Sequence, residues 1–325
     1  MSGVNVSFAI YGSTLDNTTT ESSGDFSKSL NSLGIYTLTY SKSGYFGVNQ
    51  SGTLATDDQT LVVVTLSQLP EGCLAGTVYG TITDAVSGNT VSGVSISVRS
   101  GVNVTSGSTT GITATTDSSG NYSFSSVSAG WYTVQTSKSG YTDGYFNIKS
   151  CSRVTGQDAS ITTTLSSEIM RIVLSWPTGS TASDLDSHLT IPDNASSRYH
   201  IFYSKKKFYY VTNSSTCSGC DSSDNVTLDR DDQNGPPGTE TITITKIRSG
   251  IYRYSVHDFT NRGTSSSTKL ATSGASVKVF YNDNTTTFSV PNLAGNLWGV
   301  FTFDNSSGSF TASDNMSAQS TLANI

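Results

Sequence analysis

Short runs of alternating apolar and polar residues recur along the whole chain. Residues 4–8 read VNVSF and residues 94–98 read VSISV, so every second side chain in each run is apolar. This two-residue period places one face of a strand in a core and the other face in solvent. Segments rich in Ser, Gly and Asp, such as residues 117–120, separate the runs and predict turns. Because no long stretch combines a 3.6-residue apolar period with an N-cap, the sequence predicts an all-β protein made of β-sandwich domains in series.

The first half of the chain contains an internal repeat. Residues 2–7 (SGVNVS) match residues 92–97 (SGVSIS) at an offset of 90 positions. Two further motifs within residues 22–45 recur 96 positions later, within residues 118–141. One six-residue length difference in a single loop relates the two copies, so the sequence predicts tandem domains of one fold.

The second copy carries a resemblance to a known family. Its motifs, in chain order, are GTVYGTITD at 76–84, VSGVSI at 91–96, TDSSGNYSF at 116–124, GWYTV at 130–134 and KSGY at 138–141. In this order they resemble the carboxypeptidase regulatory-like domain, and the resemblance covers about residues 74–166. It implies a transthyretin-like or Cna-B-like sandwich that serves as a structural module without catalysis.

The chain changes character from about residue 170. The motifs that follow are a Trp strand at 172–176, DLDSH at 184–188, an acidic turn LDRDD at 228–232, GPPGTE at 235–240 and GIY at 250–252. This order resembles a family of secreted and surface β-domains of unknown function, over about residues 170–303. The resemblance implies a fold and a compartment, and little chemistry. We therefore expect three domains, at residues 1–69, 70–167 and 168–325.

The first copy has no equivalent of the strand at 76–84 in the sequence as given. A sheet that lacks a strand exposes unpaired backbone groups, which are a template for another chain. We expect a strand of a neighbouring subunit to fill this place by head-to-tail β-strand addition. The expected donor is the C-terminal segment after about Phe301.

Composition limits the class of protein. Only 13% of the residues are charged and 34% are hydrophobic, and the net charge is −6. Such a chain has no basic surface for phosphates, so we expect no nucleic-acid partner. The 16 Tyr and 13 Phe argue against disorder. We also expect no membrane span, because no apolar run approaches the roughly 18 to 20 residues required, and no signal peptide is visible in residues 1–20.

Cysteines and acceptor sites indicate an oxidising compartment. The chain has four cysteines, which allow three pairings if all are oxidised. From their placement we expect Cys73 to pair with Cys151 and Cys217 with Cys220. Reduced cytosolic thiols are the alternative for all four. Cys217 and Cys220 could also form a redox pair or half of a zinc site, but their loop follows no strand-to-helix turn and no second cysteine pair is present.

Eleven Asn-X-Ser/Thr patterns favour secretion with covalent glycans, although a chain this rich in Ser and Thr contains many by chance. The predicted glycosylation sites are Asn5, Asn17, Asn49, Asn103, Asn121, Asn194, Asn213, Asn225, Asn284, Asn305 and Asn315.

Acidic residues are concentrated in the last domain of this charge-poor chain. The candidate metal ligands are Asp184, Asp186, Asp229, Asp231 and Asp232, with Glu240 near them in sequence. Carboxylate oxygens are the ligands that Ca²⁺ takes, so a calcium ion is the one cofactor expected. The alternative is that these residues cap turns. His188 is expected to pack within its strand, and the alternative is that it orients or binds the ion.

No motif for catalysis is present, since the chain lacks a Gly-X-Ser-X-Gly elbow and a His-Glu-X-X-His helix. We therefore expect no enzymatic activity and no catalytic residues. The sequence favours an extracellular structural protein, a self-assembling glycosylated subunit of a cell-surface filament whose partner is a second copy of the chain. The alternative is a cell-surface adhesin or carbohydrate-binding protein, and an accessory region of a larger enzyme is the least favoured.

Overall fold

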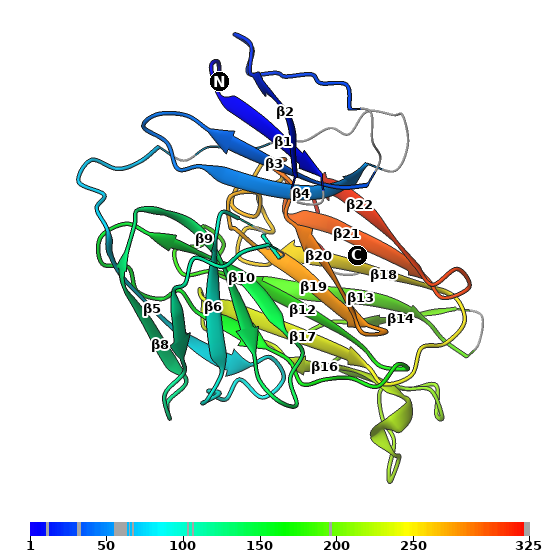
Figure 1. Ribbon diagram of the computed structural model, residues 1–325. Coiled ribbons are helices and arrows are strands. Elements are labelled where there is room, and N and C mark those ends of the chain that lie inside the picture. The colour runs from blue at the N-terminus through cyan, green and yellow to red at the C-terminus, as the bar shows by residue number, and fades with distance from the viewer. Residues whose placement is uncertain are drawn as a thin grey trace. The chain divides into compact units, whose positions relative to one another are not determined.

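The computed structural model describes residues 1–10, 13–30, 34–54, 64, 66, 68–102, 104–105, 107–194 and 197–321. Within these residues the protein is all β, with one 3₁₀ turn at Ser222–Asp224 (Figure 1). The all-β sandwich prediction is confirmed. Contacts divide the chain into two compact units, one formed by Met1–Ile82 with Val91–Gln157 and the other by Thr83–Thr90 with Asp158–Ile325. The three expected domain boundaries stay a prediction.

The first unit begins with a four-stranded antiparallel sheet. Its strand order is β2 (Ser13–Thr19), β1 (Asn5–Ile10), β3 (Gly34–Ser41) and β4 (Val48–Leu54). The alternation predicted for residues 4–8 is present, because Val4, Val6 and Phe8 are buried and Asn5 is exposed. Phe26 and Leu30, which are half-buried, pack against this core.

The strands of the second copy form two further sheets, and they belong to this unit except for residues 83–84 and 159–161, which fall in the second unit. One has the order β10 (Gly144–Ser150), β9 (Gly130–Ser137), β6 (Ser95–Ser100) and β7 (Thr113–Thr115). The other consists of β11 (Ala159–Ile161), β5 (Gly76–Asp84) and β8 (Asn121–Val127). Val78, Ile82 and Phe124 are each at most 2% exposed, so β5 and β8 bury one face.

The internal repeat extends to individual hydrogen bonds. The order β2-β1-β3-β4 of the first copy is the order β7-β6-β9-β10 of the second. In the second copy, Gly93 N donates to Thr116 O and Val94 N donates to Thr116 Oγ1, both at 2.9 Å. Gly3 and Val4 make the same two bonds to Thr20, also at 2.9 Å. The repeated sequence therefore forms repeated local structure.

The second unit contains two larger antiparallel sheets, whose middle strands are labelled in Figure 1. The first sheet has the order β15 (Lys207–Tyr209), β16 (Asn225–Arg230), β17 (Gly238–Ile244), β12 (Met170–Trp176), β19 (Ser276–Tyr281) and β20 (Asn284–Ser289). The second has the order β14 (Arg198–Ile201), β13 (Leu185–Pro192), β18 (Ile251–Asp258), β21 (Leu297–Asp304) and β22 (Ser309–Ser317).

Aromatic side chains fill the core of this unit. Trp176 is 1% exposed and Trp298 is 0% exposed. Gly238 lies opposite Trp176 in the β12–β17 register, and a Cβ at this position would lie 1.9 Å from the Trp176 ring. The glycine is therefore required by the close approach of the indole.

The C-terminal segment has a different role from the one expected. Instead of extending away as a strand donor, Ser309–Ser317 forms β22 and pairs with β21 in its own sheet. Phe310 packs against Phe301 and Phe303, with ring centroids 5.3 and 4.7 Å away. The weak alternation of apolar residues in this segment is enough to form an edge strand, because only one of its faces meets the core.

Candidate functional site

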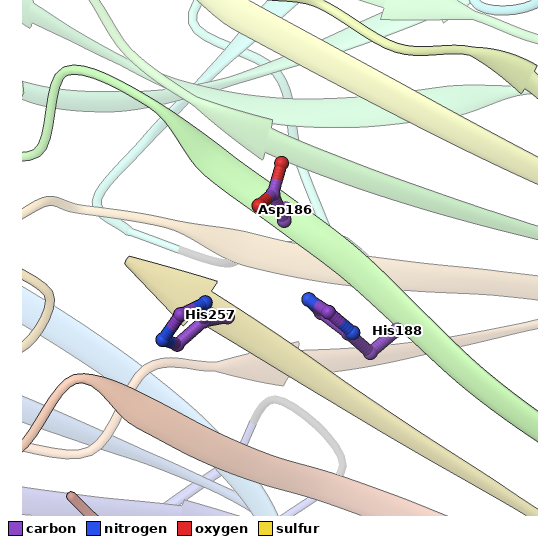
Figure 2. A group of neighbouring side chains, drawn as sticks. All are labelled: Asp186, His188 and His257. Atoms are coloured by element: carbon purple, nitrogen blue, oxygen red, sulfur yellow. The ribbon is translucent and has the colours of Figure 1, made fainter. Parts of the chain in front are cut away.

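Polar side chains gather on one face of three neighbouring strands, β14, β13 and β18. Asp186 on β13 lies directly opposite His257 on β18 in the antiparallel register. His188 is two residues further along β13 and therefore projects from the same face. Figure 2 shows the His188 ring directed from β13 toward His257 on the next strand. Leu185 and Leu189 have the opposite parity and belong to the hydrophobic core.

All three histidines of the chain meet at this place. The ring centroid of His188 lies 5.0 Å from that of His200 and 5.7 Å from that of His257. His188 Nδ1 and His200 Nε2 share a hydrogen bond of 2.9 Å. Phe202 stacks on His188 at a centroid distance of 5.7 Å and shields that side of the cluster.

Carboxylates from the facing sheet adjoin the same strand. One ligand atom from each of Asp186, Asp231 and Glu240 lies within 4.8 Å of the others. The amide of Ser187 donates a 2.5 Å hydrogen bond to Glu240 Oε2. Lys206 forms an ion pair with Asp231 at 2.8 Å. Asp186 therefore belongs to two groups, one with histidines and one with carboxylates.

Several atoms of these groups are buried without a hydrogen-bond partner. The carboxylate atoms are Asp186 Oδ2, Asp231 Oδ1 and Glu240 Oε1, and the imidazole atoms are His188 Nε2 and His257 Nδ1. Asp186 is 4% exposed, His188 1% and Glu240 1%. A buried polar atom without a partner costs about 1–3 kcal/mol, more for a charged group. A proton shared between the carboxyl groups of Asp231 and Glu240 would satisfy that pair, whereas Asp186 Oδ2, His188 Nε2 and His257 Nδ1 have no such partner.

Burial shifts the pKa values of these side chains in the direction that favours the neutral form of each. Desolvation, together with the negative charges of Asp184 and Asp231, raises the pKa of Asp186 to about 7. Desolvation and Asp186 also raise the pKa of Glu240. Desolvation lowers the pKa of His188 well below its usual value, with smaller contributions from the other two histidines. The pKa of His200 falls to about 4, mainly through desolvation.

The five aspartates predicted as metal ligands lie in different surroundings. Asp186 and Asp231 come together, and the half-buried Asp184 lies close enough for the charge of Asp231 to raise its pKa, after desolvation as the larger cause. Asp232 instead caps the acidic turn, accepting from Arg230 Nη2 at 2.8 Å and from Thr239 N at 3.2 Å. Asp229 is exposed on β16.

The residue of these groups that the sequence did not single out is His257, whereas Glu240 was noted beside the predicted ligands and His188 was expected to pack within its strand. The parity of residues 184–188 does place Asp186 and His188 on one strand face. Nothing in the sequence, however, indicates that β18 pairs beside them and brings His257 into contact. Whether a metal ion binds stays a prediction.

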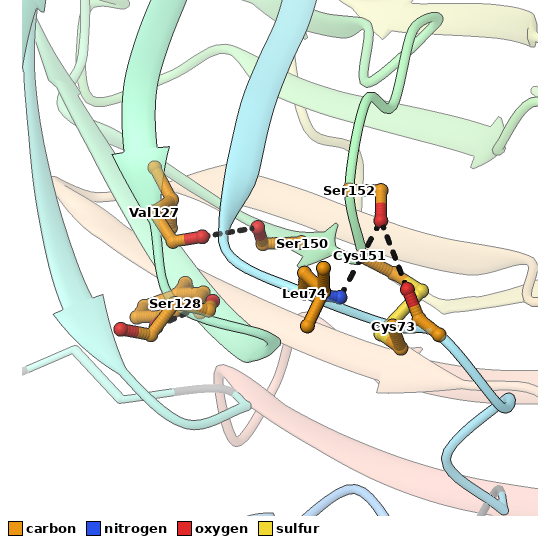
Figure 3. The surroundings of a disulfide bond; sticks show 9 residues. Cys73, Leu74, Val127, Ser128, Ser150, Cys151 and Ser152 are labelled. Atoms are coloured by element: carbon orange, nitrogen blue, oxygen red, sulfur yellow. Dashed lines mark hydrogen bonds between the residues drawn. A yellow bond between two sulfur atoms is a disulfide. The ribbon is translucent and has the colours of Figure 1, made fainter.

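The structure pairs all four cysteines. Cys73 bonds to Cys151 with a Cα separation of 4.8 Å, and Cys217 to Cys220 with 5.6 Å. Figure 3 shows Ser152 beside the first bond, where its Oγ accepts from Leu74 N and donates to Gly72 O. Together these contacts tie the segment before β5 to the end of β10.

The predicted glycosylation sites differ in exposure. The exposed asparagines are Asn5, Asn17, Asn121, Asn194, Asn213, Asn284 and Asn315. Asn305 is half-buried, and Asn225 is 5% exposed, which leaves no room for a sugar in the folded protein. Asn103 and the side chain of Asn49 lie outside the described residues.

Among the residues that the structure describes, no helix is long and apolar enough to cross a membrane.

Part of the chain matches a known family. Residues 77–166 match the carboxypeptidase regulatory-like domain, which confirms the resemblance predicted for the second copy. No curated protein matches the chain.

Solved structures that resemble the chain are distant. A chain of a type II cohesin–X-dockerin complex from Acetivibrio cellulolyticus is 24% identical over 27% of this chain and 52% of its own length, with a TM-score of 0.19. The Bacillus anthracis TIE protein is 13% identical over 90% of this chain and 46% of its own, with a TM-score of 0.23. The shaft pilin SpaA from Lactobacillus rhamnosus GG is 15% identical over 50% of this chain and 88% of its own, with a TM-score of 0.23. This chain thus spans about half the length of the first two, and TM-scores this low support no statement about function.

Proposed function

We propose that this protein is an extracellular structural subunit that assembles head to tail into a glycosylated surface filament through β-strand addition. In this proposal residues 1–69, the first copy, are also a carboxypeptidase regulatory-like domain. Residues 168–325 are a domain of the secreted β-domain family that their motifs resemble. The proposal is carried by one observation: residues 25–30 form no strand, whereas their counterpart in the second copy is the paired strand β8.

The two copies share a turn and then diverge. In the second copy Asp117 N donates to Asn121 O and Gly120 N donates to Asp117 O, and β8 follows. In the first copy Glu21, Asp25 and Gly24 make the corresponding bonds. Residues 25–30 then form no strand, and among the described residues no strand pairs with them.

The side chains after the turn also differ in burial. Tyr122 in β8 is 4% exposed, and β5 lies beside it. Its counterpart Phe26 is half-buried, although it packs edge-on against Phe8 and Tyr40 at centroid distances of 6.0 and 5.9 Å. A strand in the place of β5 would complete the sheet and cover this aromatic residue.

A second copy of the chain is the proposed source of that strand. A contact between two different surfaces of identical chains propagates into a filament unless it closes into a ring. Because β22 is an integral strand of its own sheet, truncating the C-terminus would unfold the donor subunit rather than test the contact. Low net charge per residue, paired cysteines and exposed Asn acceptor sites support an extracellular location. The proposed role requires no catalysis.

The register of the second copy identifies which amides an added strand would use. Ile82 N donates to Gly120 O, and Gly80 and Val78 lie opposite Tyr122 and Phe124. Since hydrogen bonds join alternate pairs in an antiparallel ladder, the amides of Tyr122 and Phe124 face β5. Their counterparts in the first copy are the amides of Phe26 and Lys28.

The test is the substitution Lys28→Pro in the full chain. Proline removes the amide that would face the added strand and is excluded from paired positions in a sheet. We expect Lys28→Pro to abolish filaments, as seen by negative-stain microscopy, at concentrations where the parent polymerises. Lys28→Ala is the matched control, because it removes the 2.5 Å ion pair with Asp16 but keeps the amide. An exposed ion pair of this kind contributes little to stability because water screens it, so Lys28→Ala should still polymerise.

Circular dichroism and thermal unfolding must show that Lys28→Pro is folded. Filaments formed normally by a folded Lys28→Pro protein would overturn the proposed contact. Monodisperse rods from the parent protein would instead favour the adhesin alternative. A natural precursor whose upstream residues supply the strand within the same chain would also overturn strand addition.

A further inference from the structure

We infer that Asp186, His188 and His257 form a binding site for one borderline transition-metal ion, with Zn²⁺ as its representative. This site goes beyond the proposed filament function and does not depend on it. It also differs from the calcium site expected from the aspartates, because two of its three ligands are imidazoles.

The ligand atoms are defined by what the other atoms of each side chain already bind. His257 Nε2 lies 3.1 Å from the carbonyl oxygen of Gln319, which can only accept, so Nε2 carries the proton. The lone pair of His257 is then on Nδ1, which is buried and has no partner. A carbonyl that orients a histidine in this way is the usual outer partner of a metal-bound imidazole.

His188 is held in a corresponding way by His200. Their 2.9 Å contact joins His188 Nδ1 to His200 Nε2. When His188 Nδ1 donates to His200, the lone pair of His188 is on Nε2, which is also buried without a partner. The 2.9 Å contact fits either tautomer of His188, and the proposed site uses the one in which Nδ1 donates to His200. In that arrangement His200 is a positioning residue for His188.

Distances between the three residues suit a single ion after small adjustments. One ligand atom from each of Asp186, His188 and His257 lies within 4.8 Å of the others. Bonds of about 2.0–2.1 Å to a tetrahedral ion place ligand atoms roughly 3.4 Å apart, so rotations of side chains would close the site. The unpartnered atom of Asp186 is Oδ2, and this carboxylate supplies the negative charge.

Donor chemistry selects the class of ion. Imidazole suits Zn²⁺ and other late divalent ions, whereas Ca²⁺ takes six to eight oxygens.

A pocket of about 280 Å³ borders the cluster at His188. It is lined by His188, Thr190, Arg198, Arg253 and Ser255, all from β13, β14 and β18.

The test is calorimetric titration of the metal-stripped full chain with ZnCl₂, together with thermal unfolding. We expect one Zn²⁺ per chain and a Tm that rises by about 5–10 °C at a hundredfold excess over Kd. Bound Co²⁺ should show the visible absorption of a tetrahedral site. His188→Gln and Asp186→Asn should each weaken Zn²⁺ binding by about 100-fold or more, and His200→Gln by about 10–100-fold through the loss of positioning.

Asp229→Asn is the matched control, because Asp229 is an exposed carboxylate of the same unit outside the cluster. It should bind Zn²⁺ as the parent does. Thermal unfolding of each metal-free variant verifies that it is folded. Absence of Zn²⁺ binding, or equal binding by folded His188→Gln and the parent, would overturn the site. A Tm that rises with Ca²⁺ and not with Zn²⁺ would also overturn it and would place the ion among the carboxylates.

Discussion

Single side chains fix the turns on which the repeated sheets depend. Asp117 Oδ1 accepts hydrogen bonds from the amides of Ser119 at 2.8 Å and Asn121 at 2.9 Å. These bonds, with that from Asn121 as the larger cause, hold the pKa of Asp117 below its usual value. In the first copy Glu21 takes this place, and the same two backbone bonds close the turn.

Replacing Asp117 by Ala should lower the Tm near neutral pH, because two amides lose their acceptor. The folded-state pKa lies below the usual value of an aspartate, so this stabilisation is complete above the usual pKa and disappears as the pH falls through the folded-state pKa. The Tm difference between Asp117→Ala and the parent should therefore shrink in acid. Circular dichroism melts between about pH 6 and pH 2 measure it, with the exposed Ser118→Ala as control. A difference that is constant over this range would contradict the role of the charge.

At the scale of elements, one covalent link closes the second copy. The Cys73–Cys151 bond joins residues 78 positions apart, whereas Cys217 and Cys220 are separated by 3. A crosslink across a long loop removes more conformational freedom from the unfolded chain than one across a short loop. The two bonds should therefore contribute very differently to stability.

The double substitution Cys73→Ser with Cys151→Ser should lower the free energy of unfolding of the first unit by about 2–4 kcal/mol. Cys217→Ser with Cys220→Ser should change the stability of the second unit much less. Urea unfolding followed by tryptophan fluorescence and circular dichroism, under non-reducing conditions, compares the two variants. Similar losses from both would argue against loop length as the cause, and four free thiols in peptide maps of the native protein would reject both bonds.

At the scale of the whole molecule, the exposure of the asparagine acceptors decides where glycans can be attached. Attached glycans would keep this charge-poor protein soluble in place of charged side chains. The polypeptide mass is 34.2 kDa. We expect the intact natural chain to be heavier because of attached sugars, and glycopeptide mass spectrometry to locate them at exposed acceptors such as Asn5 and Asn284. Asn225, at 5% exposure, should be unmodified and serves as the internal control. A natural chain of unmodified mass, or a glycan on Asn225, would contradict this prediction.

The sequence by itself determined the fold class and the repeat. Alternation in residues 4–8 and 94–98 predicts strands because successive side chains point to opposite faces, and the structure has β1 and β6 there. The motifs at 76–141 were sufficient to identify the domain at 77–166, because turns and aromatics recur at fixed places along the chain. These features depend on residues that are close together in the chain, so they can be recognised from the sequence alone.

Only the tertiary structure decided which distant residues meet. Asp186 and His257 are 71 positions apart in sequence, and it is the pairing of β13 with β18 that places them opposite each other. The pattern around Asp229 and Asp232 is equally favourable for binding an ion in the sequence. In the structure Asp229 interacts with Thr243 and Arg171 instead, and Asp232 caps a turn. Likewise, the apolar residues of 309–317 do not reveal whether the segment leaves the domain or joins it, and β22 joins it. Strand order and register are set by packing over the whole sheet, so no local pattern contains them.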